Sequence, residues 1–215
     1  MDEYKKEFVN FLLSTNALKV FENPEEDRKL KSGRISPWFV NIGDFNEGET
    51  SGALANFYAD AIINWEKEWK ETTGSLPFPE GQRAFDVLYG IPDKGVGLAP
   101  PIAIAMALKG HNVGWCFSRK DEKTHGEASN LGLADRMKKL IVGKTPKERD
   151  SIVQIDDVFT AGDAKYAARE FLDSLGKFNF PLLSIAVDRQ EVAIDSRNAI
   201  QEYQEKNRNT SYLNC

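Results

Sequence analysis

The chain has 215 residues, of which 41% are hydrophobic and 28% charged, a composition that predicts one globular domain with a sizeable core. Its formal net charge of −5 argues against nucleic acid as the main partner, because binding of the nucleic-acid phosphate backbone usually requires a basic face. No signal-peptide pattern and no apolar stretch of roughly 18 residues is found, so a cytoplasmic protein without membrane contact is expected. The two cysteines, Cys116 and Cys215, can form neither a disulfide framework nor a zinc cluster.

Two amphipathic helices are predicted in the first third of the chain. Apolar residues recur at helical spacing in 4–13 and again in 54–69. The predicted apolar face of the second helix consists of Leu54, Phe57, Tyr58, Ala61, Ile62, Trp65 and Trp69.

Four short apolar runs then alternate with helical patterns. Strands are predicted at 85–90, 113–117, 152–156 and 182–187, and helices at 97–110, 164–175 and about 192–206. This alternation is typical of an α/β fold, in which helices cover a mostly parallel sheet. The sequence TPKE at 145–148 has Thr, Pro and Glu at the positions of a helix start, so a short surface helix is predicted there.

Two adjacent acids, Asp156 and Asp157, end the third predicted strand, and the small turn Thr-Ala-Gly at 160–162 follows them. Ligands of parallel sheets bind beyond the carboxyl ends of strands. Adjacent carboxylates repel, so they need a cation, a metal or hydroxyl donors nearby, and the turn can direct N–H groups at an anion. A solvated acidic loop that caps the next helix is the structural alternative. Phosphoaspartate and Walker-type patterns do not fit.

The run IDDVFTAG resembles the phosphoribosyl-diphosphate (PRPP) binding loop of type I phosphoribosyltransferases, and further segments narrow the resemblance to the orotate phosphoribosyltransferase family. LKSGRISPWFVNIG (30–43) is similar to the family's amino-terminal motif, and GIPDKGVGLA (90–99) to its diphosphate-contacting loop. FSRKDEKTHGE (117–127) resembles its mobile catalytic loop, and VDRQE (187–191) the end of its last core strand. The segments occur in the family's order and cover most of the chain from 30 to 191.

The resemblance implies Mg²⁺-dependent transfer of a phosphoribosyl group from PRPP to orotate, which yields orotidine 5′-monophosphate and diphosphate in pyrimidine biosynthesis. It also implies a type I phosphoribosyltransferase fold, here one domain over 1–215 with a small hood at about 1–45 and an α/β core at about 46–215. The expected partners are the four small molecules and a second copy of the chain, in a homodimer whose mobile loop completes the neighbour's site.

Negative charge grows on the departing diphosphate, so cations should gather there. The catalytic candidates are Lys123, Arg119 and His125, and a protonated His125 could donate to diphosphate near neutral pH. The resemblance assigns PRPP binding to Lys31, Lys94, Arg119, Lys120, Lys123, His125, Asp156, Asp157, Thr160, Ala161, Gly162, Asp163 and Ala164. It assigns orotate binding to Lys31, Phe39, Val40, Thr160 and Arg189. The planar fork of Arg189 suits a carboxylate, and Mg²⁺ is expected mainly on PRPP, with Asp156 or Asp157 acting through water.

The sequence departs from the family pattern at several places. Asp163 stands where Thr or Ser is usual, and its carboxylate should repel a 5′-phosphate, so the side chain is predicted to turn away and cap the helix or pair with Lys165. Asp93 precedes Lys94 where many relatives carry an aromatic residue, and Val40 replaces the second of two aromatic residues. The segment 143–150 is longer than the family pattern predicts.

Other interpretations of the same residues stay open. The charged run 119–127 could be a solvated loop, Arg189 could pair with Asp188 or Glu191, and Phe39 could be core. A phosphoribosyltransferase for another base is one alternative function, and base specificity would distinguish it. The other alternative is a PRPP-sensing, non-catalytic regulator that binds RNA. The acidic net charge and the intact charged loop argue against it.

Overall fold

A six-stranded sheet forms the centre of the protein, with the strand order β10-β9-β8-β5-β6-β7. The computed structural model describes residues 3–30, 33–73, 84–119, 132, 135, 139–190, 198–207 and 210–214. The strands are β5 (Val87–Gly90), β6 (Gly114–Ser118), β7 (Ile141–Gly143), β8 (Ser151–Phe159), β9 (Asn179–Asp188) and β10 (Ser211–Asn214). Neighbouring strands run parallel except β7, which pairs antiparallel with β6.

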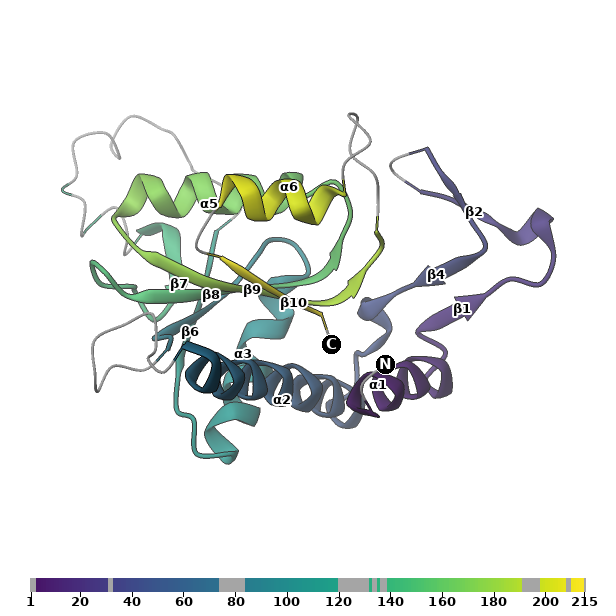
Figure 1. The fold of residues 1–215 in the computed structure, drawn as a ribbon, viewed down its shortest axis with the longest axis horizontal. Coiled ribbons are helices and arrows are strands. Elements are labelled where there is room, and N and C mark those ends of the chain that lie inside the picture. Colours follow the sequence, from purple (N-terminus) through teal and green to yellow (C-terminus); the bar gives the residue numbers. More distant parts are fainter. Residues whose placement is uncertain are drawn as a thin grey trace.

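Helices cover both faces of this sheet (Figure 1). On one face lie α5 (Asp163–Leu175) and α6 (Ala199–Lys206), and on the other α1 (Glu3–Ser14), α2 (Gly48–Thr73) and α3 (Gly95–Leu108). Alternate residues of a strand point to opposite faces, so Val153 packs in the hydrophobic cluster of α2 and α3 while Ile152 packs in that of α5. The predicted α/β fold is therefore confirmed.

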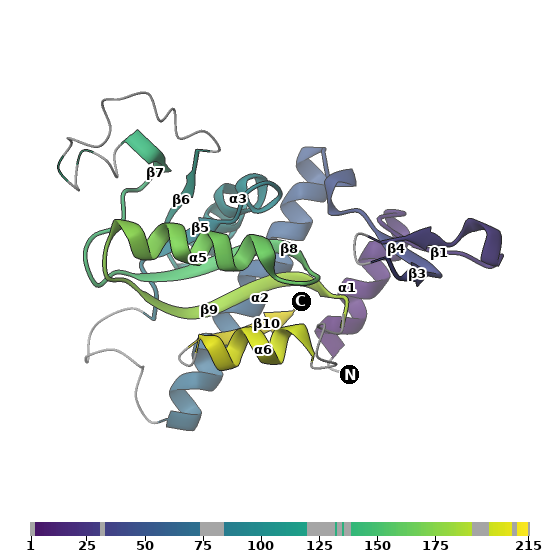
Figure 2. The same cartoon turned by 90° about the horizontal axis from the view of Figure 1, so that it is seen from above.

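A small antiparallel region, the hood, lies beside the carboxyl ends of β8 and β9 (Figures 1 and 2). It contains the strand pairs β1 (Leu18–Val20) with β4 (Trp38–Val40) and β2 (Arg28–Lys29) with β3 (Ile35–Ser36), and the short helices η1 (Pro24–Glu26) and η2 (Ile42–Asp44). Helix α1 connects the hood to the core, because Phe8 and Leu12 are buried in the core cluster that contains both Val40 of β4 and Ile62 of α2.

Two predicted elements differ from the structure. No helix forms at 145–148, where Arg149 has a left-handed φ of 70° and the Lys147 N–H donates to the Asp150 carboxylate at 2.9 Å, so the chain turns instead. The last predicted helix starts at Ala199, and 191–197 lies outside the described residues. No helix within the described ranges is long and apolar enough to cross a bilayer.

Candidate active site

The three motifs that follow β5, β8 and β9 meet at one edge of the sheet. These strands are parallel neighbours, with β8 between β9 and β5, so their carboxyl ends share that edge. Strand β8 extends beyond β5, which pairs with it only as far as Ile155, and continues alongside β9 to Phe159. Asp156 and Asp157 therefore lie inside β8, at the place where the neighbour on one side has ended.

Asp156 is buried, with 4% of its surface exposed, and it points to the face of the sheet that α5 covers. Its carboxylate forms an ion pair with Lys165, whose ammonium group also donates to the Val158 carbonyl at 2.6 Å. Burial raises the pKa of Asp156 to about 6, while the Lys165 charge opposes that rise and the Asp157 charge adds to it. The acid pair thus has its cation within the chain.

The ion pair of Lys165 with Asp156 also bears on the prediction made for Asp163. The structure pairs Lys165 with Asp156, so the predicted ion pair between Asp163 and Lys165 is wrong. Gly162 is the residue that caps α5, and Asp163 is an exposed first-turn residue whose charge is favourable at a helix N-terminus.

The turn between β8 and α5 has the form of an anion cradle. Gly162 has a φ of 89°, and a Cβ there would lie 3.0 Å from the Phe159 ring, so the position requires glycine. Thr160 and Ala161 are exposed beside it. The N–H groups of the first turn of an α-helix have no carbonyl partner within the helix, and those of Asp163 and Ala164 start α5. This edge can therefore bind a phosphate.

The loop after β5 lies tightly against β8. A Cβ on Gly90 would lie 2.3 Å from the Gly95 carbonyl oxygen, and one on Gly95 would lie 2.2 Å from the Ile155 carbonyl oxygen. The Ile91 N–H donates to the same Ile155 oxygen at 2.9 Å. Glycine at these two positions brings the start of α3 next to the acid pair.

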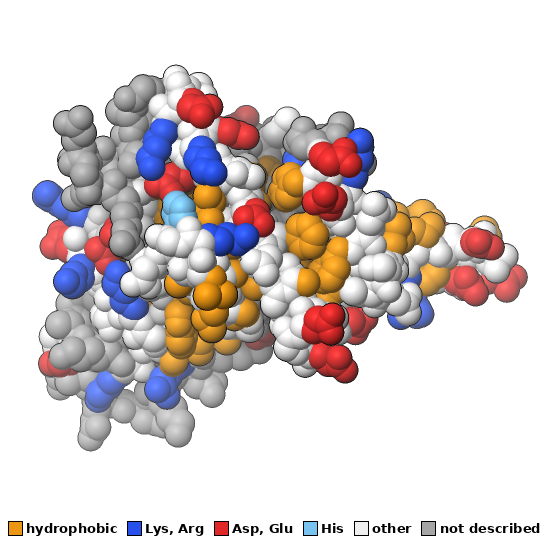
Figure 3. All heavy atoms as spheres, turned by 90° about the horizontal axis from the view of Figure 1, so that it is seen from below, with side chains coloured by type: hydrophobic (Ala, Val, Ile, Leu, Met, Phe, Trp, Pro, Cys, Tyr) orange, Lys and Arg blue, Asp and Glu red, His pale blue; other side chains and the backbone are white. Residues whose placement is uncertain are grey.

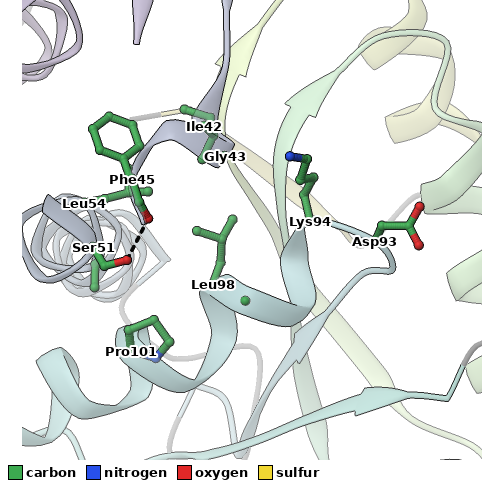
Figure 4. Close-up of a pocket in the computed structure, with 11 residues that line it drawn as sticks. Ile42, Gly43, Phe45, Ser51, Leu54, Asp93, Lys94, Leu98 and Pro101 are labelled. Carbon is green, nitrogen blue, oxygen red and sulfur yellow. Dashed lines mark hydrogen bonds between the residues drawn. The ribbon is translucent and has the colours of Figure 1, made fainter. Parts of the chain in front are cut away.

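Lys94 extends from this loop toward the hood (Figure 4). Its Nζ lies so close to Gly43 of η2 that a Cβ there would approach it to 2.6 Å, whereas the neighbouring Asp93 side chain points away. A hollow of about 250 Å³ lies beside Lys94, between η2 and the first turns of α2 and α3, and it has mostly apolar walls such as Phe45 and Leu98. It does not include the acid pair, and the loop after β5 contributes Asp93 and Lys94 to its wall.

Arg189 joins the end of β9 to the hood. It is 7% exposed, and its backbone N–H donates to the Phe159 carbonyl at 3.2 Å. Its Cζ lies 4.8 Å from the Trp38 ring centre and 5.7 Å from the Phe39 ring centre. The structure therefore brings together Arg189 and Phe39, two of the predicted orotate residues. Val40 differs from them, because its side chain is buried in the core cluster.

The cationic candidates are only partly described. Arg119 is exposed directly after β6, where its N–H donates to the Leu140 carbonyl at 2.9 Å. Lys31, Lys120, Lys123 and His125 lie outside the described residues.

Sequence reasoning assigned no contact with the acid pair or with Arg189 to three residues of this region, namely Lys165, Trp38 and Tyr58. The buried Tyr58 hydroxyl donates to the Asp156 carbonyl at 2.7 Å, which ties α2 to β8. A hydroxyl on the apolar face of a predicted helix needs a buried partner, so Tyr58 carried a signal. Lys165 carried none, because a lysine in the first turn of a helix is usually solvated.

Comparison with known proteins adds independent evidence. Over 202 residues the chain is 35% identical to the orotate phosphoribosyltransferase of Nitrosospira multiformis, covering 94% of this chain and 74% of that protein. It is 36% identical over 203 residues to the orotate phosphoribosyltransferase of Yersinia pestis (strain Pestoides F), covering 94% and 79%. The crystal structure of the enzyme from Francisella tularensis superposes with a TM-score of 0.70 at 28% identity, over 97% of this chain and 85% of that one. No family model matches the chain.

Fold and site together place the chain among the type I phosphoribosyltransferases. The relatives at 35% and 36% identity narrow this class further: the chain belongs to the orotate phosphoribosyltransferase family. The family and fold class predicted from the sequence are confirmed.

Proposed function

We propose that this protein transfers the phosphoribosyl group of PRPP to orotate in a Mg²⁺-dependent reaction of pyrimidine biosynthesis, and releases diphosphate and orotidine 5′-monophosphate. The observation that carries the proposal is the meeting of the loop 90–95, the acid and glycine loop 156–163 and Arg189 at one sheet edge beside the hood. Each of the three suits a different part of the two substrates. Membership of the family supports orotate as the base.

The end of β8 and the turn that follows it suit the phosphorylated ribose. Carboxylates accept hydrogen bonds from ribose hydroxyls, and the half-buried Asp157 lies at the open edge. The N–H groups at the start of α5 would hold the 5′-phosphate, with Thr160, Ala161, Gly162 and Ala164 around it. The two functions of this short loop explain why acids and a glycine turn follow one another.

Arg189 and the hood suit the base. A guanidinium group binds a carboxylate with two parallel hydrogen bonds, and orotate carries one carboxylate. Trp38 and Phe39 hold the guanidinium plane by cation–π contact, and Phe39 is 38% exposed and so available to a planar base. Lys31 and the backbone of Thr160 are the other proposed base contacts.

Lys94 and Arg119 suit the leaving group, together with Lys120, Lys123 and His125 of the loop that lies outside the described residues. The bond from ribose C1 to diphosphate breaks as the orotate nitrogen attacks, so cations that contact diphosphate stabilise the transition state. Mg²⁺, when bound, would neutralise part of the diphosphate charge. It usually binds one or two carboxylates, with phosphates and waters completing its ligands, so Asp157 acting through water would fit it.

A homodimer with shared sites is part of the proposal. The helix α3 has no charged residue between Gly95 and Leu108, and its outer face exposes Ile104 (62%) and Leu108 (85%). Figure 3 shows hydrophobic side chains gathered over this helix. A helix that is apolar all round is normally buried, and a second copy would cover it beside Lys94. The hood at about 1–45, the core at about 46–215 and a cytoplasmic location complete the proposal.

The shared sites predict complementation between two inactive variants. A Lys123→Ala chain and a chain with Asp156→Asn and Asp157→Asn should each turn over slowly at limiting PRPP, because one lacks a loop cation and the other the acid pair. Their mixed dimer would contain one site built only from intact parts, so mixing should restore turnover. Activity no higher than that of either parent, in a sample with proven mixed dimers, would rule out the shared arrangement.

The base is tested by competition. Purified protein with Mg²⁺ and PRPP should convert orotate, while uracil, adenine and hypoxanthine, which lack the carboxylate for Arg189, should remain unused. Conversion of one of these bases in preference to orotate would favour the alternative phosphoribosyltransferase.

A further inference from the structure

Lys165 occupies a position that is unfavourable for a cation in two respects. It lies in the first turn of α5, where the helix dipole repels positive charge, and it is 4% exposed, although lysine is rarely buried. Its ammonium group contacts the Asp156 carboxylate and the Val158 carbonyl and lies 5.6 Å from the Phe159 ring centre. All of these partners belong to the end of β8.

Both oxygens of the Asp156 carboxylate are engaged within the protein. Oδ2 pairs with Lys165 from α5, and Oδ1 accepts from the Asp157 N–H at 2.9 Å. On the other side of the strand, the Tyr58 hydroxyl of α2 binds the Asp156 carbonyl. Asp156 is thus held from α5, from α2 and from its own strand, with its carboxylate turned away from the open edge.

Asp157 has a different environment, although it is the adjacent residue. It is half-buried, and its Oδ1 accepts from the Val158 N–H at 2.7 Å. Within the described part of the chain, no side chain is seen to donate to its carboxylate. Successive strand residues point to opposite faces, so turning Asp156 toward α5 directs Asp157 to the other side.

We propose that Lys165 is a positioning residue, which takes Asp156 as its internal partner and leaves Asp157 as the carboxylate that meets the ribose hydroxyls. The inference deepens the proposed function and rests on it. It divides the acid pair into an inner member that fixes the end of β8 and an outer member that binds ligand. The division also limits repulsion, because Asp157 and Asp163 would otherwise face a phosphorylated ligand together with a third carboxylate.

Matched substitutions of the two acids test this division. The Asp157→Asn change should raise the KM for PRPP at least tenfold, the usual effect of weakening hydrogen bonds to a charged group, with a smaller change in kcat. The same change at Asp156 should raise that KM less than about threefold, because Lys165 keeps the side chain turned inward. Equal KM increases for the two variants, or a larger increase for Asp156→Asn, would overturn the proposal.

A second set of variants tests the role of Lys165. The Lys165→Met change leaves Asp156 as an unpaired buried charge, so it should lower the urea midpoint and raise the KM for PRPP. The Lys177→Met change, at an exposed lysine after the same helix, should alter neither. Adding Asp156→Asn to Lys165→Met should recover most of the lost midpoint, because no unpaired charge remains. A Lys165→Met protein with unchanged midpoint and KM, or a double variant without recovery, would overturn the proposal.

A binding measurement on the unaltered protein distinguishes failure of this inference from failure of the proposed function. Calorimetric titration of Mg²⁺ and PRPP into the unaltered protein is the reference, and absence of binding there would contradict the proposed function itself. The urea unfolding of the single and double variants needs no ligand, so it measures the coupling between Lys165 and Asp156 in either case. If Lys165→Met does not fold, the comparison of the two asparagine variants decides.

Discussion

Replacing Arg189 by lysine should weaken orotate binding while the positive charge is kept. Arg189 is 7% exposed and oriented by the rings of Trp38 and Phe39, at 4.8 and 5.7 Å from its Cζ, so water cannot readily replace a lost contact. Lysine lacks the planar fork and so loses one of two charge-assisted hydrogen bonds. Such a bond contributes about 1.5–3 kcal/mol, which corresponds to an increase of about 10- to 150-fold in the KM for orotate.

Steady-state kinetics with orotate and PRPP varied in turn give the measurement, and the KM for PRPP should stay nearly constant. Arg169→Lys is a matched control, because Arg169 also lies over an aromatic ring, 3.8 Å from the Phe180 centre, but pairs with Asp173 on α5. The control should leave both KM values unchanged. An unaltered KM for orotate in Arg189→Lys, or an equal effect of the control, would refute the assignment of Arg189 to the base.

Three further predictions concern the charged loops. Lys123→Ala should lower kcat by about 10²- to 10³-fold, the usual loss for one transition-state donor, and a loss confined to the KM for PRPP would contradict this. Asp163→Thr should tighten PRPP binding, more so at low ionic strength because the Debye length is about 10 Å at 0.1 M salt; weaker binding at two salt concentrations would refute it. Burial raises the pKa of Asp156 from 3.8 to about 6, so the folded protein retains a proton there that the unfolded chain has released. The stability that this proton contributes is present below about pH 4 and is lost as the pH rises to about 6. Asp156→Asn should remove this decrease in the free energy of unfolding, measured with urea across that pH range, and an equal decrease in both proteins would disprove the prediction.

The strands that carry the site were predictable because they are long apolar runs. Strands β8 and β9 are buried on both faces, and the sequence locates them, although β8 runs three residues past the predicted end at Asp156. That extension comes from pairing with β9, a tertiary interaction that no local pattern contains. Strand β10 was missed for the same reason, because the four residues SYLN are too few to show a pattern and form a strand by pairing with β9.

The ligand-binding loops were recognisable by their residue types, but their contacts were not. Glycine at 90 and 95 indicates that another part of the backbone lies close to this loop, but the sequence does not show that the Ile155 carbonyl is that neighbour. The hood strands of two or three residues are too short for periodicity to reveal. The acid pair was expected to need a cation, a metal or hydroxyl donors nearby, but the sequence did not indicate that Lys165, nine residues downstream of Asp156, is this cation.

The reaction itself is the most direct measurement of the proposed function. Purified protein, Mg²⁺, PRPP and orotate are mixed, and the loss of orotate absorbance is followed together with the release of diphosphate. The proposal predicts that orotate disappears and diphosphate appears in equal molar amounts, and that Asp157→Asn slows both at least tenfold at limiting PRPP. No loss of orotate, or diphosphate release at the same rate without orotate, would contradict it.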